Sequence, residues 1–351
     1  MSSFSVPVIR IRGIEPIANG DAIELAVVGD YRSVVRKGQF TAGSLAVYLP
    51  EASVLPDSLI GELGLVGKLA GGARNRIKAI RLRGCLSQGI LLDRIPANAN
   101  EGDCVAMSLG VVKYDPPVPA HMAGEVANLS GHPLRYDIEN FKAFPDVLAD
   151  GEDVEMTEKT HGTFCGAGVV PGLVHPEMCG GDGLVYSKGL GSKGLVFRDN
   201  GANAGNLYMQ AVRAADLHAA IRRVFPGHTV HVLGEVYGAG VQDLAYGRRD
   251  RTFAAFDINV DGRYLDRDAF STAVAELGIA RMPVLYRGPF SRATLYAHTD
   301  GNTVVGGGAH IREGVVVVPV AERRDATIGR VVLKSVSGDY LTRKGDATEF
   351  N

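Results

Sequence analysis

The sequence has few cysteines, no long apolar run and no large excess of charge of either sign. None of its apolar runs reaches the roughly 20 residues of a membrane-spanning helix, so we expect no membrane partner. The first residues lack a basic region followed by an apolar core, and we therefore expect no secretory signal. The four cysteines form no CxxC pair and no histidine cluster lies near them. This favours free thiols in a reducing cytoplasm over a structural zinc site.

The net charge of −2 excludes a general polycation, so a nucleic-acid partner must be held by a local basic patch. One such patch spans residues 74–83, which contain five cationic side chains and no acid. The apolar alternation changes phase between Ala79 and Ile80, as in a bulged strand. On a barrel face its cations would follow a phosphate backbone; alternatively, the charges protect an edge strand. The candidate nucleic-acid-binding residues are Arg76, Lys78, Arg81 and Arg83.

Residues 1–115 have the pattern of a small, mostly β domain. Short runs rich in β-branched residues are separated by glycine turns, which is typical of a small barrel such as an OB-fold. One stretch, residues 57–69, has helical character. The expected strands are residues 22–28, 31–36, 45–49, 77–82 and 89–92.

A proline-rich segment at residues 116–119 predicts a linker, because such segments are extended and continue neither a strand nor a helix. We place the linker at 116–134 and a second domain at 135–351. Apolar spacing predicts helices over residues 206–224 and 268–277. Strands are expected at residues 314–320, 330–334 and 340–342. The predicted fold class is therefore α+β, with an OB-like β-barrel followed by a mixed α/β domain.

The most informative segment is residues 154–163, in which a lysine leaves a predicted strand and a glycine follows three residues later. Enzymes that form a lysyl-AMP need such a lysine at the floor of a nucleotide pocket. There, partial desolvation and nearby cations keep enough of its amine neutral for attack on phosphorus. A glycine lets the backbone approach the nucleotide. Alone, the tetrapeptide from Lys159 to Gly162 favours a surface lysine before a turn, because it arises by chance in many proteins.

Five further motifs follow in order, at residues 184–189, 232–238, 253–258, 312–317 and 331–334. With them, the sequence resembles the covalent nucleotidyltransferase superfamily of ligases and capping enzymes. It is most similar to the ATP-dependent RNA ligases that place an OB module before the catalytic domain. The resemblance spans nearly the whole chain. It implies that residues 135–351 form a nucleotidyltransferase domain with antiparallel sheets and an ATP-grasp-like fold.

The resemblance also implies a role for each matched residue. Lys159 would be the nucleophile, and Glu313 would help to hold a divalent metal, Mg²⁺ or Mn²⁺. The remaining residues would bind the nucleotide: Glu158 and His161 beside the adenosine, Gly162 admitting it, Lys188 at a phosphate, Glu235 at the ribose, Phe256 stacked on adenine, and Lys334 at the α-phosphate. Taken singly, Lys188 could be a solvated charge, Phe256 a core residue and Lys334 a strand end.

The implied function is an ATP-dependent RNA ligase that seals breaks between a 3′-hydroxyl and a 5′-phosphate in RNA-containing nucleic acid. Alternatives are a nucleic-acid-binding protein with an inactive nucleotidyltransferase domain, a capping enzyme or a DNA ligase. The presence of Lys159, Glu235 and Glu313 argues against an inactive domain. The N-terminal position of the OB module argues against the other two. The sequence predicts no oligomeric state.

Two features depart from a simple match. Ligases of this superfamily commonly have a second lysine two residues after Lys334, where this chain has Val336. Arg343 or Lys344 could supply that charge. Residues 189–194 match GxGxxG, but a strand-like run follows where a Rossmann fold needs a helix, so we expect a turn between strands. No P-loop motif is present. Because every nucleotide motif follows the linker, we expect the N-terminal module to hold nucleic acid and contribute little to the reaction with ATP.

Overall fold

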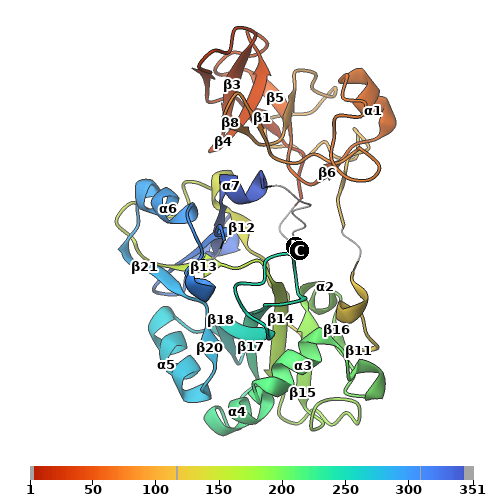
Figure 1. Ribbon diagram of the computed structural model, residues 1–351, viewed down its shortest axis with the longest axis vertical. Coiled ribbons are helices and arrows are strands. Elements are labelled where there is room, and N and C mark those ends of the chain that lie inside the picture. Colours follow the sequence, from red (N-terminus) through yellow and green to blue (C-terminus); the bar gives the residue numbers. More distant parts are fainter. Residues whose placement is uncertain (1–3, 116–117, 309, 344–351) are drawn as a thin grey trace.

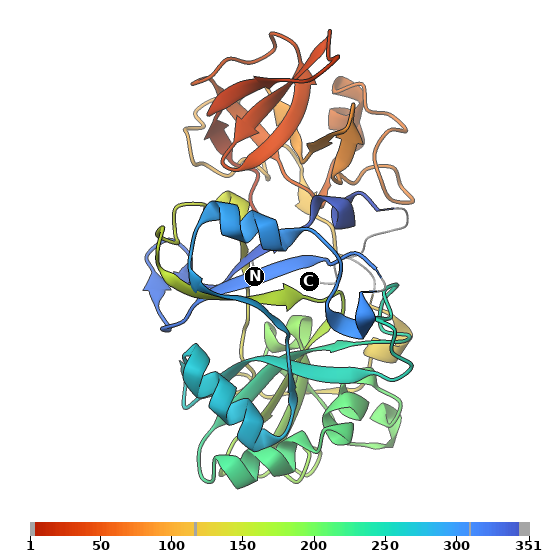
Figure 2. The same ribbon diagram turned by 60° about the vertical axis from the view of Figure 1, so that its left-hand side comes forward.

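A computed structural model of the protein describes residues 4–115, 118–308 and 310–343. The chain forms three tiers along its long axis (Figures 1 and 2). The N-terminal module is the first tier, a five-stranded sheet is the second, and a six-stranded sheet covered by helices is the third. Among the described residues, no helix combines the length and apolarity required to cross a bilayer.

The N-terminal module is built from short antiparallel strands around two apolar clusters. One sheet has the order β1-β5-β9 and another the order β2-β3-β4, while β7 and β8 form a hairpin. The strands are β1 (Val8–Arg10), β2 (Gly13–Pro16), β3 (Ile23–Val28), β4 (Tyr31–Arg36), β5 (Leu45–Leu49), β6 (Ser53–Val54), β7 (Ile80–Leu82), β8 (Cys85–Ser87), β9 (Ile90–Leu92) and β10 (Val112–Lys113).

Two predictions in this module were too long. The helix expected over residues 57–69 is only α1 (Asp57–Glu62), because Gly64 and Gly67 adopt positive φ angles of 64° and 72°. The strand expected over residues 77–82 is only β7. Arg76 instead pairs in isolated bridges with Val54 and Ala70, so the chain runs across the module before β7 begins.

The second domain contains two main sheets. The five-stranded sheet has the order β12-β25-β22-β13-β21, and the six-stranded sheet the order β15-β14-β17-β18-β19 with β20 beside β18. Most pairs are antiparallel. Their strands are β12 (Glu139–Asn140), β13 (Asp153–Lys159), β14 (Thr163–Val169), β15 (Gly183–Ser187), β17 (Val230–Tyr237), β18 (Thr252–Val260), β19 (Arg263–Tyr264), β20 (Ala280–Arg281), β21 (Val284–Pro289), β22 (Gly314–Pro319) and β25 (Leu333–Val336).

Helices cover the outer face of each sheet. The largest apolar cluster joins the six-stranded sheet to α3 (Leu207–Ala214), α4 (Leu217–Val224) and α5 (Arg267–Leu277). The helix α6 (Arg292–Thr299) packs on the five-stranded sheet. The single helix expected over residues 206–224 was wrong. Asp216 takes a left-handed φ of 45° and separates α3 from α4.

Three connecting segments also differ from the simplest expectation. Residues 340–342 were expected to form a strand, but Tyr340 and Leu341 belong to α7 (Gly338–Leu341), which is capped by the Ser337 hydroxyl. The GxGxxG segment contains one helical turn, α2 (Lys188–Gly191), before β16 (Leu195–Phe197). Residues placed in the linker form a 3-10 turn (Ala120–Met122) and β11 (Val126–Asn128), and β11 pairs with β16.

The N-terminal module docks on the second domain through polar contacts. The Asp30 carboxylate accepts hydrogen bonds from Tyr296 Oη at 2.8 Å and Arg292 Nη1 at 3.3 Å. On the other side of the interface, Arg81 Nη2 binds Asp339 Oδ1 at 2.5 Å at the start of α7. The module is therefore tied to two helices that flank the five-stranded sheet (Figure 1).

Candidate active site

A cavity of about 880 Å³, its open mouth included, lies between the two sheets of the second domain. The five-stranded sheet contributes Thr157, Lys159 and Lys334, and the six-stranded sheet contributes Glu235 and Phe256. Of the sequence-predicted residues, the structure brings together in the cavity wall Glu158, Lys159, Lys188, Glu235, Phe256 and Lys334. These residues come from five separate motifs.

Lys159 is the last residue of β13, and its side chain is 18 % exposed. Its Nζ contacts Oε1 of Glu313, whose side chain is only 1 % exposed. A buried carboxylate needs a partner to offset its lost hydration. The lysine and the glutamate predicted as nucleophile and metal ligand therefore form one ion pair at the edge of the cavity.

Strand register places three side chains on one face of the sheet. Lys159 lies opposite Gly314, and Gly314 lies opposite Val336. Thr157 lies opposite Val316, which lies opposite Lys334. Opposed residues of neighbouring strands project to the same face, so Lys334 and Val336 share the face of Lys159. The position at which related ligases have a second lysine is thus directed toward the site, but here it carries a buried valine.

Of the two substitutes proposed for that lysine, the structure describes only Arg343, which does not line the cavity wall. The Arg343 guanidinium binds the Asp243 carboxylate, with both N–O distances 3.1 Å, and stacks 3.9 Å from the Tyr340 ring centre. Lys344 lies outside the described residues. The compensating role of either residue stays a prediction.

Glu235 lies on β17 opposite Phe164 of β14 and is partly exposed to the cavity. Burial raises the pKa of its carboxyl to about 8, against the opposing effect of Lys159. The nearby Glu313 raises the same pKa further. Because a neutral carboxyl can donate as well as accept a hydrogen bond, Glu235 can bind a ribose hydroxyl in either role.

Aromatic rings form one wall of the cavity. The Phe256 ring centre lies 5.2 Å from that of Tyr136 and 6.0 Å from that of Phe164. Tyr136 also donates a hydrogen bond from Oη to Asp257 Oδ2 at 2.9 Å. Sequence reasoning missed Tyr136 and Phe164. Tyr136 follows the proline-rich linker outside any motif, so no pattern indicated it.

Glu158 and His161 are held by protein contacts. The Glu158 carboxylate accepts a hydrogen bond from Val304 N at 2.8 Å and another from the Thr303 hydroxyl. His161 contacts Tyr340 Oη at 2.8 Å through Nδ1 and Asp243 Oδ1 at 2.6 Å through Nε2. Burial lowers the pKa of His161 to about 4, so the ring is neutral at pH 7.

His161 is therefore directed toward α7, and among the described residues it does not line the cavity. The expectation that Gly162 admits the adenosine stays a prediction, and the structure shows a packing reason for a glycine there. A Cβ at this residue would lie 2.4 Å from the Val236 carbonyl oxygen and 2.8 Å from Glu235 Cγ. The glycine lets β17 and the Glu235 side chain approach the turn after Lys159.

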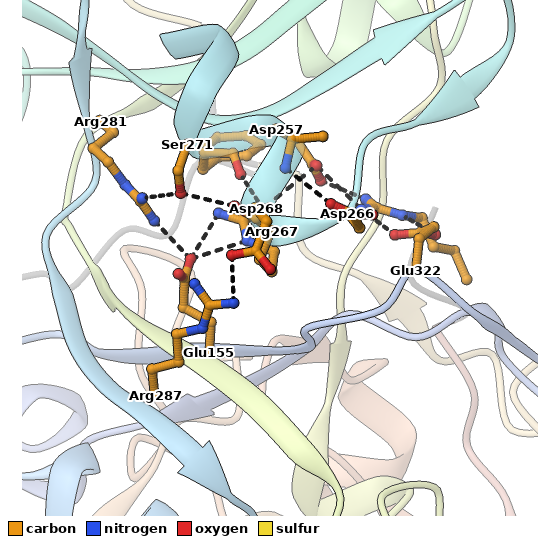
Figure 3. Close-up of polar contacts among 12 residues, drawn as sticks. Glu155, Asp257, Asp266, Arg267, Asp268, Ser271, Arg281, Arg287 and Glu322 are labelled. Carbon is orange, nitrogen blue, oxygen red and sulfur yellow. Dashed lines mark hydrogen bonds and ion pairs between the residues drawn. The ribbon is translucent and has the colours of Figure 1, made fainter. Parts of the chain in front are cut away.

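A buried ionic network lies beside the cavity (Figure 3). Arg267 donates from Nε to Glu155 Oε1 at 2.9 Å, and Arg281 Nη2 reaches the same oxygen at 2.6 Å. Arg330 binds the Asp257 carboxylate, which lies 3.7 Å from Arg267 Nη1. Glu155 belongs to the five-stranded sheet and Asp257 to the six-stranded sheet. The network thus fixes the two cavity walls relative to each other.

Lys188 begins α2 at the mouth of the cavity, and its Nζ lies 3.3 Å from Asp137 Oδ1. The carboxylate thus holds the ammonium group in place. Lys188 and Lys334 both lie in the cavity wall, so they supply two cations besides Lys159. Two lysines near Lys159 are the arrangement that a phosphate-bearing ligand needs.

The predicted basic patch is divided by the fold. Arg76 is buried, and its guanidinium lies 4.3 Å from the Tyr114 ring centre. Arg81 is exposed but binds Asp339 of α7. Lys78 and Arg83 are exposed, and Arg83 takes a positive φ of 51° in the turn after β7. Of the four candidates, Lys78 and Arg76 lie along one groove, described below.

The family models agree with this architecture. Residues 152–336 match the model described as RNA ligase, and residues 5–94 match a model of an OB-fold domain. An OB-fold module followed by a two-sheet domain defines the chain as a nucleotidyltransferase of the ligase type. Since the first match covers more than half of the sequence, the chain belongs to the RNA ligase family. No curated protein sequence matches it.

Solved structures with the same fold are those of Naegleria gruberi RNA ligase. The structure of that ligase with PPi has a TM-score of 0.80 and 24% sequence identity, covering 97% of this chain and 98% of the other. A mutant of the same ligase with ATP and Mn has a TM-score of 0.79 and 23% identity, covering 96% and 98%. A mutant with AMP and Mn gives the same values. This likeness shows that the fold extends over both domains.

Proposed function

We propose that this protein is an ATP-dependent RNA ligase that joins a 3′-hydroxyl to a 5′-phosphate through a lysyl-AMP intermediate. The supporting observation is that Lys159 shares one cavity with Lys188, Lys334, the carboxyl of Glu235 and the ring of Phe256, each drawn from a separate motif. A mutant of Naegleria gruberi RNA ligase, which has the same fold, has been solved with ATP and Mn. The substrate that fits this family is a nicked or broken RNA-containing strand.

Lys159 performs the first step. Its neutral amine attacks the α-phosphorus of ATP, so an N–P bond forms and the bond to pyrophosphate breaks. The AMP then passes to the 5′-phosphate of the strand, and a 3′-hydroxyl finally displaces AMP. Lys334, on the same sheet face as Lys159, stabilises negative charge on the α-phosphate. Phe256 and Tyr136 bind the base, and Glu235 binds the ribose.

The residues present fit a divalent metal that arrives with ATP. Mg²⁺ commonly takes one or two carboxylates and completes its shell with phosphate oxygens and water. The structure places the Glu313 carboxylate at Lys159 Nζ, and Glu235 is close enough for Glu313 to raise its pKa. Among the described residues no group of three or more metal-ligating side chains occurs. Bound there, Mg²⁺ or Mn²⁺ would neutralise phosphate charge, with Glu313 as the protein ligand.

The experiment is incubation of the full chain with metal and ATP labelled at the α-phosphate. A covalent adduct that is stable to base and labile to acid is expected, as for a phosphoramidate. Lys159→Ala should abolish the label, whereas Lys193→Ala, which changes an exposed lysine outside the cavity, should retain it. Full labelling of the Lys159 variant would overturn the mechanism.

A parallel incubation with labelled GTP separates the alternatives. Label from GTP but not ATP would indicate a capping-type enzyme. If the folded protein took label from neither nucleotide, it would be a nucleic-acid-binding protein with an inactive domain. A nicked duplex carrying RNA or DNA on either side of the break then identifies the strand that is sealed.

A further inference from the structure

A long groove crosses the N-terminal module on the side of its β7–β8 hairpin. One wall is formed by β4 and β9, and the other by the segment that runs from the end of α1 to β7. Ile80 and Leu82 of β7 line it and stay 43% and 39% exposed. The groove is separate from the cavity that contains Lys159, with which it shares none of its lining residues.

The groove is cationic although the whole chain is slightly acidic. Its lining contains five cationic side chains, those of Arg36, Lys68, Arg74, Arg76 and Lys78. It contains two carboxylates, and both have neighbours: Glu62 lies 3.2 Å from Arg94, and Asp93 accepts a hydrogen bond from Gln39. The local excess of positive charge contrasts with the net charge of −2 over the sequence.

Within the described residues, four of these cations form no ion pair with a carboxylate. Other arginines of the module form ion pairs, such as Arg10 with Glu101 and Arg32 with Glu15. By contrast, in the part of the chain that the structure describes, no ion pair to a carboxylate involves the exposed side chains of Arg36, Lys68, Arg74 or Lys78. A row of cations left without counter-charges is the arrangement that binds a polyanion through its phosphates.

The lining also indicates which part of a nucleic acid is bound. None of the described residues in the groove wall is aromatic. Recognition of single strands commonly relies on aromatic rings on which bases stack. Double-stranded RNA, in contrast, is bound mainly through its phosphates and 2′-hydroxyls. The groove therefore suits the outside of a duplex better than unstacked bases.

We propose that this groove binds the sugar–phosphate backbone of duplex RNA beside the break, without reading its sequence. The proposal rests on the proposed RNA ligase function and assigns its substrate contact to Arg36, Lys68, Arg74 and Lys78. Of the residues predicted from the sequence, Lys78 keeps a direct role. Arg76 supports the groove wall from its buried position on Tyr114.

The test measures binding of the full chain to a nicked RNA duplex by fluorescence anisotropy at several salt concentrations. The double variant Arg36→Ala/Lys78→Ala should bind more weakly, and its plot of log affinity against log salt should be less steep by about 2. Lys37→Ala is the matched control, because Lys37 is exposed and adjacent to Arg36 but does not line the groove. The single variant Arg36→Ala should make the salt dependence less steep by about 1. Lys37→Ala should change that slope by much less.

A slope and an affinity equal to wild type in the double variant would overturn the proposal, and so would a preference for single-stranded RNA over the duplex. The urea midpoint of each preparation shows whether each variant is folded. Labelling of Lys159 with AMP, measured on the same preparations, distinguishes the two proposals. Absent labelling with intact, groove-dependent RNA binding would refute the ligase chemistry alone, whereas normal labelling with unchanged RNA binding would refute the groove alone.

Discussion

Glu235 should make the free energy of unfolding depend on pH, and Glu235→Gln should remove that dependence. Its carboxyl has a pKa of about 8 in the folded protein, against 4.5 for an ordinary glutamate. Below pH 4.5 it is protonated in both states and its contribution to stability is complete. As the pH rises, the unfolded chain loses the proton first. The free energy of unfolding therefore falls between about pH 4.5 and pH 8 and then levels off.

The size of the effect follows from the same values. The difference between 4.5 and about 8 corresponds to at most about 5 kcal/mol. Because the side chain is partly exposed to the cavity, where water can solvate its charge, we expect about 2–3 kcal/mol. Gln keeps the shape of the side chain and cannot ionise. Relative to wild type, the variant should therefore gain about this amount of stability between pH 5 and pH 9.

Urea denaturation at the two pH values measures the change. The protein is treated with pyrophosphate beforehand, so that any AMP on Lys159 is removed and both proteins are compared in the same state. If the stability difference between variant and wild type were the same at pH 5 and pH 9, Glu235 would not be the titrating group.

Three other changes test the surroundings of the site. Glu155→Ala leaves the buried Arg267 and the half-buried Arg281 without their shared carboxylate, so the free energy of unfolding should fall by about 3–5 kcal/mol in urea denaturation; a loss below 1 kcal/mol would contradict this. Tyr340→Phe removes the hydroxyl next to His161 Nδ1 and should cost about 1–3 kcal/mol of stability, whereas an unchanged urea midpoint would show that the contact is dispensable. If Arg343 replaces the lysine missing at Val336, Arg343→Ala should slow labelling of Lys159 far more than it lowers the urea midpoint. The loss of transition-state stabilisation should be about 1.5–3 kcal/mol. Unchanged labelling kinetics would exclude that role.

Much of the architecture could be predicted because local patterns determine it. Strands β4 and β5 were expected at their observed bounds, since turn signals flank them: Gly29 and Asp30 precede β4, and Gly43 and Pro50 enclose β5. The helix α5 was expected within one residue of its start. The single helix over 206–224 failed because apolar spacing continues across Asp216, and a left-handed residue leaves no apolar signal.

The site was predictable only where motifs carry it. Six predicted residues line one cavity, although they are spread over four strands and the helical turn α2, because the order of their motifs fixes the elements on which they lie. Contacts between distant segments could not be foreseen. His161 lies near Tyr340 through packing of α7, and Tyr136 reaches Phe256 from beyond the linker. No spacing in the sequence encodes either distance.

The contacts of α7 link the two halves of the molecule more directly than the order of motifs suggested. At its start, Asp339 binds Arg81 of the N-terminal module. One residue later, Tyr340 contacts His161, which lies two residues after Lys159. A displacement of the β7–β8 hairpin by bound nucleic acid would therefore be transmitted through the side-chain contacts of α7 to the turn after the nucleophile. The N-terminal module can thus influence the reaction with ATP without contributing a group to it.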